Sequence, residues 1–183
     1  MESVSPWVAR WAPLVPPGEV LDLACGSGRH ARHLAARGHA VLALDRDPAA
    51  LHAVAGAGIT AEQCDLEDGA PVAALTPARF AGIVVTNYLH RPLFAQLVAS
   101  LAPDGILIYE TFSVGNEAFG KPSNPAFLLA EGELLALAVT HGLHVIAYED
   151  GRCDSPKAAM VQRLCACGPQ FSRDQAHLAV SGA

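Results

Sequence analysis

An acidic residue directly before a glycine-rich turn is the feature of this sequence with the clearest chemistry. Asp22 lies in the apolar run 20–23, which predicts a buried strand, and Gly26 and Gly28 follow it. Because glycine has no Cβ, such a turn lets backbone N–H groups come close to a ligand. A helix is expected directly afterwards, over 30–37. A carboxylate at the strand end disfavours a pyrophosphate and favours a ligand with an ammonium group, so we expect a small ligand that carries an amino group.

The rest of the chain predicts the elements that hold this turn in place. Apolar β-rich runs alternate with helical runs, which is typical of a parallel sheet with helices on both faces. The strands are expected at 20–23, 40–45, 59–64, 80–87 and 106–110, and the helices at 30–37, from 48 onward, at 71–75 and at 92–101, with a turn at 102–105. In an open sheet of this kind, ligands bind beyond the carboxyl ends of the strands.

The last third of the chain distinguishes between two such sheets. A helix is expected at 134–141, and Gly142 ends it. Two strands, 143–148 and 158–165, then follow with only a polar loop, 149–156, between them. Strands that are joined without a crossover helix must be antiparallel. The dinucleotide-binding fold continues with parallel strands instead.

These features resemble the class I S-adenosylmethionine (SAM)-dependent methyltransferases. The first motif of that family is an acid, any residue and then Gly-x-Gly-x-Gly, and residues 22–28 read Asp-Leu-Ala-Cys-Gly-Ser-Gly, with alanine at the first glycine position. The resemblance implies an α/β, Rossmann-like, seven-stranded and mostly parallel sheet with helices on both faces and a C-terminal antiparallel strand pair. It also implies SAM as cofactor and S-adenosylhomocysteine as product. In its small size and in residues 22–29, the chain further resembles the tellurite-resistance methyltransferases.

The resemblance also implies a set of cofactor-binding residues. Asp45 would accept hydrogen bonds from the ribose hydroxyls, since Asp47 already provides the N-cap of the next helix. Asp65 would accept from the adenine amino group, or would be a surface loop acid. Arg29 would pair with the ligand carboxylate, or would be a solvated helix residue. The full expected set is Asp22, Ala24, Cys25, Gly26, Gly28, Arg29, Asp45, Arg46, Asp65, Leu66, Thr86 and Asn87.

Methyl transfer requires alignment and, for some acceptors, a group that takes a proton. His90 is a candidate base, because the ordinary histidine pKa suits neutral pH, although it could equally be a capping or solvated histidine. Tyr88 and Glu110 are the other catalytic candidates. The long Gly- and Pro-rich loop 113–131 is expected to bind or cover the acceptor. The expected acceptor-site residues are Trp7, Arg91, Phe112, Asn116 and Glu117.

The N-terminal helix over 5–12 is expected to cover this pocket, although packing on the sheet is the safer interpretation for Trp11. One domain over 1–167 is expected, with a flexible tail at 168–183. The formal net charge of −6 argues against a nucleic-acid substrate, so the acceptor is expected to be a small molecule. The scattered cysteines and histidines predict no metal site. The absence of an export signal or of a long apolar run predicts a cytoplasmic protein that does not span a membrane.

Two other functions remain open at this point. A dinucleotide-dependent oxidoreductase is one, because Gly26, Gly28 and Ala31, with Asp45 downstream, also fit its loose fingerprint. Asp22 and the antiparallel strand pair argue against it. A non-catalytic SAM-binding protein is the other, since its cofactor residues would look the same.

Overall fold

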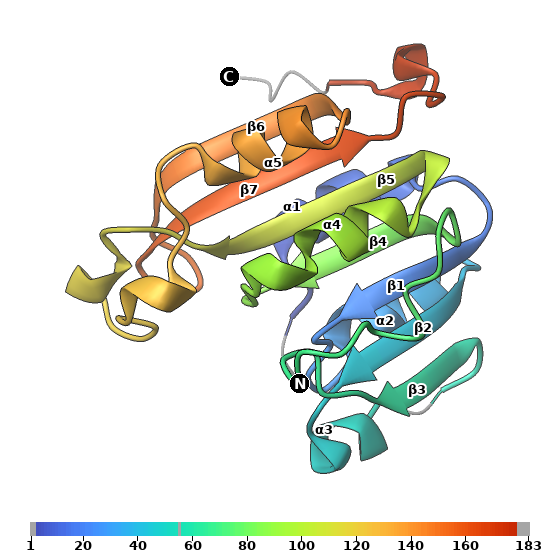
Figure 1. Ribbon diagram of the computed structural model, residues 1–183, viewed down its shortest axis with the longest axis horizontal. Coiled ribbons are helices and arrows are strands. Elements are labelled where there is room, and N and C mark those ends of the chain that lie inside the picture. The colour runs from blue at the N-terminus through green and yellow to red at the C-terminus, as the bar shows by residue number, and fades with distance from the viewer. Residues whose placement is uncertain (1–2, 55, 179–183) are drawn as a thin grey trace.

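A seven-stranded sheet forms the centre of the molecule in the computed structural model, which describes residues 3–54 and 56–178 (Figure 1). The strand order is β3-β2-β1-β4-β5-β7-β6. The strands are β1 (Glu19–Leu23), β2 (Ala40–Asp45), β3 (Ile59–Gln63), β4 (Phe80–Thr86), β5 (Leu101–Phe112), β6 (His144–Cys153) and β7 (Ala159–Cys167). β1 to β5 pair in parallel, and β7 runs antiparallel to both β5 and β6. The expected fold class is confirmed.

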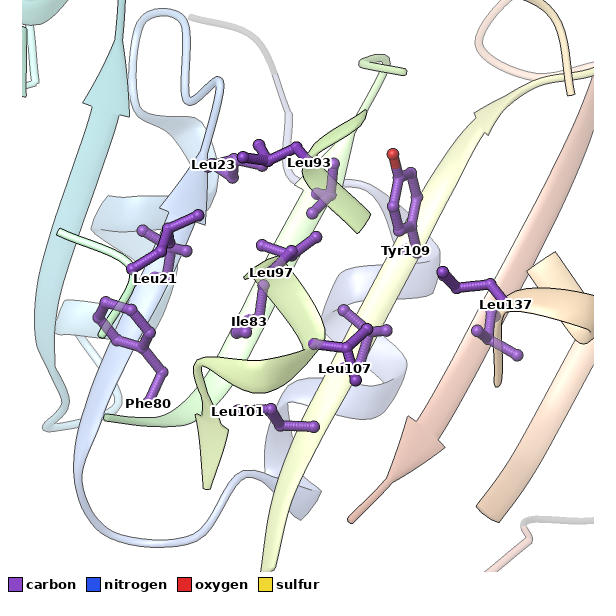
Figure 2. Packing of buried hydrophobic residues seen from close by; sticks show 14 of the residues in the cluster. Leu21, Leu23, Phe80, Ile83, Leu93, Leu97, Leu101, Leu107, Tyr109 and Leu137 are labelled. Atoms are coloured by element: carbon purple, nitrogen blue, oxygen red, sulfur yellow. The ribbon is translucent and has the colours of Figure 1, made fainter. Parts of the chain in front are cut away.

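Helices cover both faces of this sheet. They are α1 (Pro6–Trp11), α2 (Arg29–Ala35), α3 (Pro48–His52), α4 (Phe94–Ala99) and α5 (Glu133–Thr140), with short 3-10 turns at Ala12–Leu14, Arg91–Leu93, Asn116–Ala118, Pro125–Phe127 and Arg173–Gln175. α4 and α5 pack on one face, where Leu97 and Leu137 belong to the same buried cluster as Leu21 (Figure 2). α1, α2 and α3 pack on the other face, in the cluster that contains Val20. Successive strand residues therefore point to opposite layers.

The direction of the parallel strands determines which edge of the sheet can bind a ligand. β1, β2 and β4 run parallel, so their carboxyl ends, at Leu23, Asp45 and Thr86, lie at one edge of the sheet. β3 and β1 lie on either side of β2, while β4 follows on the other side of β1. The chain thus reverses its order of strand addition beside β1, and the turn that contains Gly26 sits at this reversal, where open α/β sheets bind ligands.

The helix expected at 71–75 is absent, and this prediction was wrong. The segment is a turn whose backbone is hydrogen-bonded by a side chain from α4. Gln96 Oε1 accepts from Val72 N–H at 3.0 Å, and Gln96 Nε2 donates to Val72 O at 2.7 Å. The amide of Gln96 thus satisfies both backbone groups of Val72, and Val72 O also accepts from Leu75 N–H, which closes a turn.

Three element boundaries also differ from expectation. β5 begins at Leu101 instead of residue 106, and its pairing with β4 shifts register there, so the expected turn 102–105 lies within the strand. α4 accordingly ends at Ala99. β6 continues to Cys153, because its pairing with β7 extends through most of the loop expected at 149–156. Tertiary pairing overrides the local turn signals here.

Part of the segment expected to be a flexible tail is anchored to the sheet. Gly168 N–H donates to Gly105 O, and Gln170 N–H donates to Pro103 O, both at 2.9 Å. Phe171 is buried in the cluster on the α1 face. Residues 179–183 lie outside the described residues. Among the described helices, none has the length and apolar character needed to cross a membrane.

Candidate functional site

A first cavity of about 390 Å³ lies at the carboxyl ends of the parallel strands. It collects expected cofactor residues from the ends of four strands. Its lining includes Ala24 after β1, Asp45 at the end of β2 with Arg46 after it, Asp65 and Leu66 after β3, and Asn87 after β4. A cavity of this size suits a small organic ligand.

The two glycines of the glycine-rich turn have different structural roles. Gly26 has φ +52°, and a Cβ built on it would meet nothing within 4 Å. The space over Gly26 is therefore open to a ligand. Gly28, the N-cap of α2, has φ +75°, and a Cβ there would lie 2.7 Å from Val54 Cγ1. Gly28 is thus required for close packing. Ala24 also has a positive φ of 53°, a conformation that costs a non-glycine residue energy.

Asp45 ties this turn to β2. Its Oδ2 accepts from Gly26 N–H at 2.7 Å, and its Oδ1 accepts from Asp47 N–H at 2.9 Å. Asp47 caps α3, as expected, by accepting from Ala49 N–H. The sequence did not predict that Asp45 would hold the glycine-rich turn. Each carboxylate oxygen can accept a second hydrogen bond, so the geometry leaves Asp45 able to bind hydroxyl groups in the cavity.

Asp22 is buried behind the turn and lines neither of the two cavities described here. Its Oδ2 accepts from Ala31 N–H at 2.8 Å, which supplies the α2 N-terminus with the side-chain acceptor that Gly28 lacks. Its Oδ1 is buried without a hydrogen-bond partner among the described residues. Burial raises the pKa of Asp22 to about 7, although the hydrogen bond from Ala31 N–H acts to lower it. An unpaired buried carboxylate oxygen is what a ligand with an ammonium group would require.

Three further cofactor candidates lie around the turn. The Cys25 thiol is buried, which raises its pKa to about 12, so it stays protonated near neutral pH. Thr86 lies 3.3 Å from His30, measured between Oγ1 and Nδ1. Arg29 lines the second cavity described below instead of the first. The described residues include no group of three or more His, Cys, Asp or Glu side chains placed to hold a metal ion.

A second cavity of about 180 Å³ adjoins the first, and the side chains of Asn87 and Phe112 line both. Its other walls come from the N-terminal segment, from the loop after β5 and from the loop between β6 and β7. Of the three catalytic candidates, Glu110 lines this second cavity, Tyr88 lines the first, and His90 lines neither. Burial, followed by the nearby Glu67 carboxylate, raises the pKa of Tyr88, so its hydroxyl keeps its proton at neutral pH.

Residues Ser3 to Pro6 line the second cavity, but the expected role of Trp7 is not supported. Trp7 is buried on the sheet, where its Nε1 donates to Leu164 O at 3.2 Å and its ring packs edge-on against Trp11. The packing expected for Trp11 is therefore present for both tryptophans. Apart from Pro6, the first residue of α1, the residues of this N-terminal segment that line the cavity come before the helix.

Ser5 fastens this segment to the site. Its N–H donates to His30 Nε2 at 3.2 Å, and its hydroxyl donates to Glu110 Oε1 at 2.9 Å. Burial lowers the pKa of His30 to about 3, so the ring is neutral and its Nε2 is free to accept. Glu110 Oε2 in turn accepts from Arg163 Nε. The sequence analysis missed Ser5 and Arg163, because their partners are more than fifty residues away or lie on a different element.

We expect Ser5→Ala to destabilise the protein by about 1–2 kcal/mol, because Ser5 is also the N-cap of α1 and accepts from Trp7 N–H. Thermal unfolding should show a fall in Tm of roughly 2–4 °C per kcal/mol for a chain of this length. Ser3→Ala, also in the wall of the second cavity, is the matched control and should leave Tm unchanged. Equal effects of the two substitutions would remove Ser5 from this fastening role.

Two of the expected acceptor-site residues, Arg91 and Asn116, form hydrogen bonds that stabilise the loop 113–131. Arg91 pairs with Glu133 at 2.6 Å and also donates to the carbonyl oxygens of Ala126 and Leu128. Asn116 is buried, donates to Pro122 O and accepts from Met160 N–H. Both side chains therefore shape the loop, although Asn116 also lines the second cavity.

Of the other two acceptor-site candidates, Glu117 accepts from Gly115 N–H within its own turn and lines neither cavity. Phe112 lies where the two cavities meet. The loop after β5 is thus part of the second cavity, but only some of its polar residues face it.

Comparison with known proteins agrees with this architecture. A family model described as a methyltransferase domain matches residues 20–105. No curated protein matches the sequence. Among solved structures, TehB from Haemophilus influenzae is similar, with a TM-score of 0.74 at 17% identity over 92% of this chain and 63% of TehB. The chain therefore spans less than two thirds of the length of TehB.

Two other structures match in size more closely. A SAM-dependent methyltransferase from Mesorhizobium loti has a TM-score of 0.69 at 19% identity, over 90% of this chain and 98% of that one. The 1,6-didemethyltoxoflavin-N1-methyltransferase of Burkholderia thailandensis has a TM-score of 0.63 at 24% identity, over 90% of this chain and 77% of that one. The resemblance carried by residues 22–28 is thereby confirmed: residues 20–105 match the methyltransferase-domain family, and the chain has the Rossmann-like fold of the class I SAM-dependent methyltransferases.

Proposed function

We propose that the protein transfers a methyl group from SAM to a small-molecule acceptor. The observation that carries this proposal is the charge of the first cavity. Its described lining includes three carboxylates, those of Asp45, Asp65 and Glu67, and one guanidinium, that of Arg46. An excess of negative charge suits a ligand with a sulfonium and an ammonium group and opposes a pyrophosphate.

The residues present fit SAM by their chemistry. Asp45, at the end of β2, would accept from the two ribose hydroxyls, and Asp65, after β3, would accept from the adenine amino group. Leu66 is apolar and buried beside Asp65, so it offers a surface for the flat adenine ring. The unpaired Oδ1 of Asp22 would accept from the ammonium group, which requires that end of the ligand to extend from the first cavity past the glycine-rich turn, because Asp22 lines neither cavity. The backbone carbonyls near Asn87 would orient the same end of the ligand.

Bound SAM supplies a methyl group that its sulfonium already activates for in-line displacement. The protein's own contribution would be alignment and exclusion of water. The second cavity would place the acceptor beside the first, where Asn87 and Phe112 border both. Residues Ser3 to Pro6 would close this space from solvent. Glu110, the remaining candidate at the acceptor, would act through its carboxylate or by positioning Ser5 and Arg163.

Isothermal titration calorimetry with S-adenosylhomocysteine and, separately, with NADH tests the cofactor. We expect binding of S-adenosylhomocysteine with a Kd on the order of micromolar, corresponding to about −8 kcal/mol, and no binding of NADH. Binding of NADH alone would contradict the proposal and favour the oxidoreductase.

A non-catalytic SAM-binding protein would bind S-adenosylhomocysteine equally well, so a second measurement is needed. Incubation with SAM that carries a labelled methyl group, together with a panel of small acceptors, should release S-adenosylhomocysteine in proportion to labelled product. The existence of a second cavity beside the first favours the enzyme, because a protein that only binds SAM has no need of one.

A further inference from the structure

The two adjoining cavities carry opposite charges. In the lining of the first, carboxylates outnumber cations by three to one. The described lining of the second contains four cationic side chains, those of Arg29, Lys121, Lys157 and Arg163, and one acid, Glu110. The chain as a whole has a formal net charge of −6, so this local excess of positive charge runs against the overall composition.

The use of lysine is the more specific observation. The sequence contains only two lysines, at positions 121 and 157, and both line this cavity. They come from separate segments, the loop after β5 and the loop between β6 and β7. Lys157 Nζ lies 3.2 Å from the position that a Cβ would occupy at Gly120, which brings its ammonium group against the first of these loops.

Neither lysine is paired with a carboxylate in the described part of the chain. Among the residues that the structure describes, no ion pair involves Lys121 or Lys157. The single acid of the cavity is already engaged, since Glu110 accepts from both Arg163 and Ser5. Arg163 is further balanced by Glu149 at 3.0 Å. Arg29 also has a partner in the structure. The positive charge that remains available to a ligand in the cavity is therefore that of the two lysines.

The size of the cavity limits what could provide the opposite charge. A volume of about 180 Å³ accommodates a small organic group and not a folded macromolecule. A lysine ammonium acts as a compact point charge and binds carboxylate or phosphate groups through charge-assisted hydrogen bonds.

We propose that the second cavity recognises an anionic group, a carboxylate or a phosphate, on the methyl acceptor, and that Lys121 and Lys157 bind it from two sides. This inference rests on the proposed function, because it takes the second cavity as the acceptor site. The lysines set the acceptor class, while the first cavity takes the positively charged cofactor. The opposite charges of the two cavities would disfavour binding of the acceptor in the first cavity and of the cofactor in the second.

The presence of only two lysines makes a direct test possible. Reductive methylation with ¹³C-formaldehyde labels lysine amines and preserves their charge, so the labelled protein should give one NMR signal from each lysine, apart from that of the N-terminus. Lys121→Met and Lys157→Met assign the two signals. The protein is saturated with S-adenosylhomocysteine and titrated with 4-fluorobenzoate, phenyl phosphate and, as the neutral counterpart, 4-fluorobenzamide.

We expect both lysine signals to shift saturably with at least one anion and not with the amide, and the two anions to differ in Kd, which identifies the preferred group. Each single Lys→Met variant should bind that anion about tenfold more weakly. Arg37→Met, which removes a charge from an exposed residue outside both cavities, is the matched control and should change nothing.

Two outcomes would overturn the inference: no saturable response to either anion, or an equal response to the amide. The proposed function is tested separately, by calorimetry with S-adenosylhomocysteine. The Lys121→Met/Lys157→Met double variant should bind S-adenosylhomocysteine with the wild-type Kd, because neither lysine lines the first cavity. A protein that binds S-adenosylhomocysteine but whose lysines ignore the anions would retain the proposed function and lose only the anionic acceptor.

Discussion

Replacing Asp45 with alanine is expected to weaken S-adenosylhomocysteine binding by about 1–3 kcal/mol, or roughly 5- to 150-fold in Kd. Two causes add. The substitution removes the charged acceptor for the ribose hydroxyls that the proposed function assigns to Asp45. It also removes the acceptor for Gly26 N–H, which holds the glycine-rich turn in place at 2.7 Å. Calorimetry at constant salt measures the first effect together with the second.

The unfolding temperature of the ligand-free Asp45→Ala variant separates these causes, because only the contact with Gly26 contributes there. Asp47→Ala is the matched control. Asp47 is an exposed acid two residues away that caps α3 and does not line the first cavity, so its loss should cost about 1 kcal/mol of stability without changing affinity. Unchanged affinity in Asp45→Ala would exclude Asp45 from the cofactor site.

The parts of this molecule that could be predicted from sequence are those fixed by local chemistry. The strand 40–45 and the capped start of α3 agree with the structure, because an apolar run and an N-cap aspartate followed by proline are short-range signals. The antiparallel C-terminal strands follow from the missing crossover helix. The clustering of Asp45, Asp65 and Asn87 in one cavity follows from the parallel sheet, whose carboxyl ends meet at one edge.

What could not be predicted depends on contacts between distant segments. The position of Trp7 near the N-terminus suggested a pocket cover. In the structure its indole N–H donates to Leu164 O, and its ring is buried on the sheet. Arg91 is a reasonable substrate ligand from its position, yet Glu133 and two loop carbonyls use its guanidinium. The segment 71–75, where a helix was expected, also depends on a distant contact, since the Gln96 amide of α4 binds the backbone of Val72.

The second large effect concerns the pH dependence of Asp22. Burial raises the pKa of this carboxyl in the folded protein to about 7, from an ordinary value of 3.8. Below about pH 4 it is protonated in both the folded and the unfolded chain. Between about pH 4 and 7 the unfolded chain loses the proton and the folded protein keeps it. The contribution of Asp22 to stability is therefore present at low pH and is lost as the pH rises towards 7.

The same carboxyl should make cofactor binding depend on pH in the opposite direction. An ammonium group is held by the carboxylate and not by the protonated acid, so the affinity for S-adenosylhomocysteine should rise as the pH increases from 5.5 to 7.5. Below the pKa of Asp22, this affinity can rise by at most about tenfold per pH unit. His30, with its pKa lowered to about 3 by burial, does not change its charge in this range.

Asp22→Asn isolates this effect, because the amide oxygen can still accept from Ala31 N–H but cannot become charged. We expect the variant to bind S-adenosylhomocysteine at least about tenfold more weakly at pH 7.5, with an affinity that no longer rises with pH. Its unfolding free energy should also depend less on pH between 4 and 7. Asp65→Asn makes the same change of charge within the first cavity and should keep the wild-type pH dependence. Parallel pH profiles for wild type and Asp22→Asn would show that the unpaired oxygen of Asp22 does not bind the ammonium group.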